Sequence, residues 1–233
     1  AYATSMNLPL QLQMRVGQFK TRFGRLNPTH LHTWKFATQP LVNAKFFGGE
    51  SLRGMGAELS QVVLPIPGTF RWYLSVQNIS GAATGRSFIP SKSDFEKIGD
   101  VTVSTRLEEF VALSNSWSLL TGLNYANGRN KTGRGNRTEI YGLDLYLKWK
   151  NVAEGGRSQV GWQNEFMVRR RQVPDDTLED FGGYSQLVWR PNRYWETGAR
   201  YEYVSGIGPK YDGLSLLGGT TRAVDPLDPN WTE

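Results

Sequence analysis

The sequence predicts an all-β fold, an antiparallel up-and-down transmembrane β-barrel, on three observations. Apolar and polar residues alternate along long runs, so that one face of each run is apolar. Aromatic residues make up 12% of the 233-residue chain, including 8 Trp and 10 Tyr. The mean hydropathy is low, at −0.46, as it is in membrane barrels whose strands turn every second side chain toward a polar lumen.

The run 140–150 shows the alternation most clearly. One face carries Tyr141, Leu143, Leu145, Leu147 and Trp149, and the other carries Gly142, Asp144, Tyr146, Lys148 and Lys150. The same pattern predicts nine strands, at 8–20, 56–65, 69–80, 101–114, 116–127, 138–150, 158–173, 180–190 and 193–205. Most of them reach the roughly 9–11 residues that a tilted membrane strand needs. Glu109 is an exception to the pattern, because it would place a charge on the lipid face of 101–114.

The connections between these strands are mostly short on one side and long on the other, as in outer-membrane barrels. The longest, 21–55, is expected to be an extracellular loop or one folded into the lumen. The ninth strand would end on the long-loop side, whereas barrels of this class have an even strand count and both ends in the periplasm. We therefore expect 1–233 to be one domain of a barrel with roughly 12–16 strands. The missing strands would follow the C-terminus of this sequence, and others could precede its N-terminus.

The composition excludes several classes of function. The chain has no Cys, so disulfides, thiolate nucleophiles and Cys-ligated zinc are absent. The net charge of +6 is spread along the chain rather than clustered, which argues against nucleic acid as a partner. No Ser-His-Asp pattern marks an enzyme, and no motif requires a cofactor. The acidic pairs Asp175-Asp176 and Glu179-Asp180 are expected in one solvated loop.

Charged residues on the predicted polar faces are the candidate pore lining, because a charge facing lipid costs a few kcal/mol at mid-bilayer. They are Arg15, Arg71, Asp144, Lys148, Glu165, Arg169, Arg171, Arg200 and Glu202. Their basic excess would bias a water-filled pore toward anions or polar solutes. Alternatively, acids and bases on neighbouring strands pair and only stabilise the lumen.

Two further groups of residues attract attention. His30 and His32 form an H-x-H pair that could place two imidazoles on one side of an extended segment, where both could bind the same metal ion. The alternative is a loop that uses both for local hydrogen bonds. The aromatic residues on the apolar faces and near the strand ends are expected to form interfacial girdles, with a sugar-stacking path in the lumen as the other interpretation.

Several motifs resemble a family of Gram-negative outer-membrane barrels that are porin-like and often labelled zinc-regulated outer-membrane receptors. They are FGRLNPTH at 23–30, FFGGESLRGMG at 46–56, RTEIYGLDLYLKW at 137–149, RRRQVP at 169–174, GGYSQLVWR at 182–190 and LDPNWTE at 227–233. The resemblance covers nearly the whole chain and implies further strands after the last motif. The chain shows neither the plug domain nor the 22 strands of an energy-coupled receptor, so the label implies no such import.

Together these observations predict a porin-like channel for small polar or anionic solutes in the bacterial outer membrane. The alternative is a barrel that serves as a structural or docking partner in an envelope assembly, with its lumen closed by 21–55. A metal-linked receptor using His30 and His32 is a third hypothesis. The expected partners are the lipid bilayer and lipopolysaccharide, with a second copy of the chain or an envelope complex as further candidates.

Overall fold

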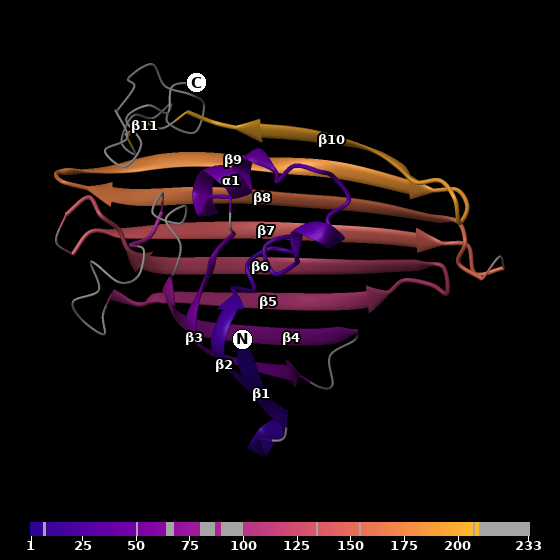
Figure 1. The fold of residues 1–233 in the computed structure, drawn as a ribbon, viewed down its shortest axis with the longest axis horizontal. Helices are drawn as coiled ribbons and strands as arrows, with labels where there is room; N and C mark the ends of the chain where they lie inside the picture. The colour runs from indigo at the N-terminus through magenta and orange to yellow at the C-terminus, as the bar shows by residue number, and fades with distance from the viewer. Residues whose placement is uncertain are drawn as a thin grey trace.

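One antiparallel sheet accounts for most of the protein (Figure 1). The computed structural model describes residues 1–6, 8–49, 51–63, 68–79, 87–89, 100–133, 135–153, 155–206 and 208–209. Neighbours in the chain are neighbours in the sheet, in the order β1 to β10, and the short β11 pairs with β9. The predicted loop at 81–100 and the chain after 206 lie largely outside the described residues, and the motif at 227–233 lies wholly outside them.

The strands are β1 (Tyr2–Ser5), β2 (Leu12–Lys20), β3 (Arg53–Val63), β4 (Thr69–Ile79), β5 (Thr102–Ala112), β6 (Trp117–Arg129), β7 (Arg137–Lys150), β8 (Gln159–Val173), β9 (Asp176–Arg190), β10 (Thr197–Val204) and β11 (Gly208–Pro209). The nine predicted strands are confirmed as β2 to β10, and the all-β, up-and-down arrangement is confirmed with them. Long strands form because each alternating run can bury one face while its backbone pairs on both sides.

Some predicted boundaries were wrong. The run 8–20 becomes a strand only at Leu12, because a 3-10 turn at Pro9–Gln11 precedes it, and Leu10 and Gln11 have φ of 61° and 58° there. The loop predicted between 173 and 179 is reduced to a tight turn, with Asp175 in the left-handed region. β9 therefore begins at Asp176 rather than at 180, and its register with β8 continues to the turn.

The segment after β2 folds back onto the sheet, as Figure 1 shows for the helix α1 (Leu41–Phe47) and the chain on either side of it. We call residues 21–49 with 51–52 the inserted segment. Asn27 closes its base, because the side-chain amide donates to the carbonyls of Thr21 and Leu52 at 2.8 and 2.9 Å and accepts from the Leu52 N–H at 2.7 Å. The two ends of the segment are thereby held side by side at the sheet.

The sheet therefore has two different faces. The covered face, on which the inserted segment lies, carries the even positions of β3, β5, β6, β7, β9 and β10 and the odd positions of β2, β4 and β8. The hydrophobic core forms there, between strand residues and apolar residues of the segment. It contains Phe23, Val42, Phe46, Phe47 and Leu52 of the segment with Ile79, Phe88, Ala126, Ile140, Met167 and Tyr184.

The open face carries the remaining strand positions and exposes large apolar side chains. Leu74, Val76, Leu107, Leu123, Leu143, Trp162, Phe166 and Leu187 are 39% to 57% exposed. Soluble monomers rarely expose so many large apolar side chains on one face. A surface of this kind is typical of contact with a membrane or with another protein. Glu109 lies on this face of β5, as the sequence predicted.

The sheet is open in the described part of the chain, where no pairing joins β1 to β10. No helix among the described residues is long and apolar enough to cross a membrane.

Candidate functional site

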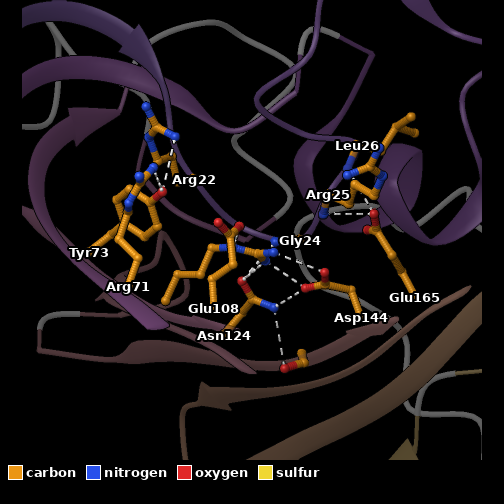
Figure 2. A network of polar contacts seen from close by, with 12 residues as sticks. Arg22, Gly24, Arg25, Leu26, Arg71, Tyr73, Glu108, Asn124, Asp144 and Glu165 are labelled. Atoms are coloured by element: carbon orange, nitrogen blue, oxygen red, sulfur yellow. Dashed lines mark hydrogen bonds and ion pairs between the residues drawn. The ribbon is translucent and has the colours of Figure 1, made fainter. Parts of the chain in front are cut away.

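The carboxylate of Glu165 on β8 binds the backbone of the inserted segment (Figure 2). Its Oε1 accepts hydrogen bonds from the N–H groups of Arg25 and Leu26, at 2.9 and 2.8 Å. Gly24 lies directly against it with φ +63°, and a Cβ at this position would stand 2.5 Å from Glu165 Oε2. The backbone at position 24 therefore lies closer to the carboxylate than it could if this residue had a side chain. Its positive φ also favours glycine.

A buried ion pair lies beside this turn. The guanidinium of Arg106 on β5 donates to both carboxylate oxygens of Asp144 on β7, at 2.5 and 2.9 Å, and to Glu108 at 3.1 Å. Asn124, on the strand between them, contacts both partners at 2.8 Å and also accepts from the Gly24 N–H at 2.9 Å. Arg106 and Asp144 are only 2% and 1% exposed, so the pair is sealed between the sheet and the segment.

Arg22 of the inserted segment extends this network toward the first strands. Its Nε donates to Glu58 on β3 at 3.1 Å, and Glu58 also pairs with Arg15 on β2 at 2.9 Å. The Arg22 guanidinium lies 4.6 Å from the ring centroid of Tyr73, whose hydroxyl accepts from Arg71 at 3.1 Å (Figure 2). Two strands, β3 and β4, thus contribute the groups that hold the Arg22 side chain, and Arg15 of β2 pairs with the same Glu58.

Helix α1 is held by a second buried cluster, around Asp180 on β9. Asp180 accepts two hydrogen bonds from Arg169, at 2.9 and 2.7 Å, and its Oδ2 lies 3.2 Å from the Lys45 ammonium. Burial lowers the pKa of Lys45, although the carboxylate of Asp180 opposes this effect. The prediction of a solvated acidic loop was wrong for Asp180, which is 3% exposed, because β9 begins four residues earlier and carries it into the sheet.

Strand β10 binds a residue that precedes α1 and the first residue of this helix. Arg200 on β10 donates to the carbonyl and the hydroxyl of Thr38, at 2.8 and 2.7 Å, and to Glu202 at 2.8 Å. Glu202 in turn accepts from the N–H of Leu41, the first residue of the helix, at 2.5 Å. This carboxylate satisfies one of the N–H groups that a helix leaves unpaired at its start.

The nine predicted pore-lining residues all lie on the covered face, as the strand registers place them. Asp144, Glu165, Arg169 and Arg171 are only 1% to 2% exposed and pack under the inserted segment or the core beside it. The other five, Arg15, Arg71, Lys148, Arg200 and Glu202, are half-buried. Several important residues were not singled out from the sequence. Arg106, Asn124 and Asp180 lie on polar faces of their strands, but Arg22 and Lys45 come from a loop without periodicity.

The two histidines lie on the surface of the inserted segment. Their rings stack with centroids 5.5 Å apart and an interplanar angle of 11°. Within the described residues, no group of three His, Cys, Asp or Glu side chains could hold a metal ion. The metal site therefore stays a prediction that rests on the sequence alone.

A pocket opens on the covered face between Arg25 of the inserted segment and the end of the sheet where most of the short turns lie. We call it the basic pocket; its volume is about 570 Å³. Its lining includes Arg25, Phe110, Trp117, Tyr146, Lys148 and Lys150. The Arg25 guanidinium lies 3.8 Å from the ring centroid of Tyr146, and a second pocket of about 240 Å³ shares these two residues. Within the described part of the chain, no acidic side chain lines the basic pocket.

Aromatic side chains form two rows on the open face, one near each end of the strands. The row nearer the short turns contains Trp117, Trp149, Trp162 and Trp189, and the row nearer the other end contains Tyr125, Tyr141, Phe166, Phe181 and Tyr203. Rings of the second row contact one another, with centroids 5.1 Å apart for Tyr125 and Tyr141 and 5.8 Å apart for Phe181 and Tyr203.

Comparison with known proteins adds a relative without a described activity. A protein from Aquifex aeolicus (strain VF5), described as an uncharacterized protein, is 31% identical over 238 residues, which are 92% of this chain and 49% of the relative. The chain thus spans about half the length of the relative that it matches. Searches of family models and of solved structures give no match.

Proposed function

We propose that this chain forms part of an outer-membrane β-barrel channel for small polar or anionic solutes, whose lumen is narrowed by the inserted segment. The observation that carries the proposal is the distribution of apolar and charged side chains between the two faces of the sheet: the apolar ones are exposed and the charged ones are buried. The open face exposes Leu107, Leu123 and Leu143, while the covered face buries ion pairs such as Arg106 with Asp144. This distribution suits a wall between lipid and a polar lumen.

The spacing of the aromatic rows supports the same conclusion. Tyr141 and Trp149 belong to different rows and are eight residues apart on β7. Eight residues of strand span about 27 Å, and a tilt of about 40° reduces this to about 21 Å along the membrane normal. Outer-membrane barrels have an apolar band of about 25 Å between aromatic girdles. The two rows are therefore separated by roughly the thickness that a membrane requires.

Closing the sheet into a barrel requires strands to pair with the edges of β1 and β10 that have no partner among the described strands. An open edge in lipid would leave backbone groups unpaired, at several kcal/mol each. In our proposal further strands complete the wall, and the covered face becomes the inner surface. The resemblance of the motifs at 23–30 and 46–56 to porin-like barrels agrees with this assignment.

The test is to locate the natural gene product and to measure its conductance. We expect it in the outer-membrane fraction, with a shift in gel mobility on heating, and we expect steady ion conductance after reconstitution into planar bilayers. A protein recovered in soluble form, without the heat-dependent shift, would contradict the membrane assignment. A folded membrane protein without conductance would contradict the channel.

A second candidate is a structural or docking barrel with a closed lumen. One observation favours it: Asp144, Glu165, Arg169 and Arg171 are enclosed by protein rather than exposed to a water-filled path. Conductance separates the two candidates, because a barrel that the segment closes would show no steady open level. Removing the segment from such a barrel would create conductance, whereas in a channel it would only increase it.

A further inference from the structure

Three cations around the basic pocket have no acidic partner among the described residues. They are Arg25 of the inserted segment and Lys148 and Lys150 of β7. By contrast, the cations deeper in the covered face are neutralised: Arg15, Arg22, Arg106, Arg169 and Arg200 each have a carboxylate oxygen within 3.1 Å. These carboxylates of the covered face therefore pair with cations that lie at or near the inserted segment, whereas Arg25, Lys148 and Lys150 bring three positive charges together at the basic pocket.

Arg25 is fixed in position for binding. Its backbone N–H donates to Glu165 at 2.9 Å, which anchors the residue to β8. Its guanidinium carbon lies 3.8 Å from the centroid of the Tyr146 ring, so the ring also holds the side chain in place. A guanidinium held in this way loses little side-chain entropy when it binds an oxyanion through two parallel hydrogen bonds.

The two lysines complete the charge of the pocket. Lys148 is half-buried and Lys150 is exposed, and both lie on the same face of β7 as Tyr146. Apolar side chains of Phe110 and Leu120, which lie on the covered face, line the same pocket. Lysine ammonium groups attract oxyanions as point charges, and the apolar wall can contact the carbon part of a small molecule.

We propose that the basic pocket binds small solutes that carry two or more oxyanion groups, either phosphates or carboxylates, at the short-turn end of the barrel. This inference rests on the proposed function in one respect: the solute reaches the pocket through the channel. Arg25 binds one oxyanion group through its guanidinium, and Lys148 and Lys150 bind another. The volume of about 570 Å³ accommodates a small molecule of this kind.

The test is calorimetric titration of the purified protein in neutral detergent with pyrophosphate and, in a separate arm, with citrate. The variants are Lys148→Gln combined with Lys150→Gln and, in the inserted segment, Arg25→Gln. The matched control is Arg157→Gln, which removes an exposed charge from a turn at the same end of the sheet. Heat-dependent gel mobility verifies that each variant folds, and Arg25→Gln keeps the comparison with Arg157→Gln available if the double variant does not fold.

We expect binding of at least one of the two anions, with Kd raised roughly tenfold by each lost charge and unchanged by Arg157→Gln. The affinity should fall as NaCl is added. The arm that binds identifies phosphate or carboxylate as the preferred group. No binding of either anion, or equal Kd in the pocket variants and Arg157→Gln, would overturn the inference. Binding without conductance would instead refute the channel and leave the site intact, so the two failures are distinguishable.

Discussion

Replacing Asp144 by Asn should destabilise the protein by leaving a buried guanidinium without its main counter-charge. Asp144 accepts two hydrogen bonds from Arg106 in the wild-type protein, and both residues are almost fully buried. Breaking a buried pair in this way costs about 3–5 kcal/mol. Glu108 remains 3.1 Å from the Arg106 Nε and compensates in part. We therefore expect a loss near the lower end, about 3 kcal/mol.

The assay is urea unfolding of the protein folded into liposomes, followed by Trp fluorescence and gel mobility. The double variant Arg106→Met with Asp144→Leu should recover much of the loss, since an apolar pair needs no counter-charge. The control is Lys35→Ala, which breaks the exposed pair of Lys35 with Glu196, 50% and 37% exposed, and should cost at most about 1 kcal/mol. If Asp144→Asn is as mild as Lys35→Ala, the network beneath the inserted segment is not the support described above.

Two further perturbations test the inserted segment and the open face. Gly24→Ala should loosen the segment, because its Cβ would stand 2.5 Å from Glu165 and φ is +63°; trypsin cleavage after Arg22 and Arg25 should rise severalfold, whereas Gly49→Ala, with open space around its Cβ, should leave cleavage unchanged. Equal cleavage of the two variants would show that the close approach does not hold the segment. Leu143→Arg on the open face should cost about 2–4 kcal/mol in liposome unfolding if this face meets lipid, and Val152→Arg in the exposed turn should cost less than about 1 kcal/mol. Similar small costs at both sites would argue against lipid contact.

The strands were predictable because their signal is local. In β7 the apolar side chains of Tyr141, Leu143 and Leu145 recur at every second position, and this period fixes both the strand and its faces. β1 carries no such signal: it has only four residues, all of them exposed, and among the described strands it pairs with β2 alone. Helix α1 is seven residues long, too short for a helical period to be evident in the sequence.

The support of the inserted segment was not predictable, for a different reason. Glu165 was recognised as a polar-face residue, but its partners are the backbone N–H groups of Arg25 and Leu26, which lie about 140 positions away. No residue type marks a backbone donor in the sequence. Asp180 was misplaced because adjacent acids suggest a loop, whereas in the structure the positive charges of Arg169 and Lys45 compensate its burial.

The central claim is that the open face meets lipid and the covered face meets a polar lumen. The chain has no Cys, so single cysteines can be introduced along β7 and labelled one at a time with a fluorescent probe. We predict that probes at Leu143→Cys, Leu145→Cys and Leu147→Cys are quenched by nitroxide lipids and protected from iodide. Probes at Tyr146→Cys and Lys148→Cys should show the opposite. Quenching by iodide at all five positions, without alternation, would contradict the account.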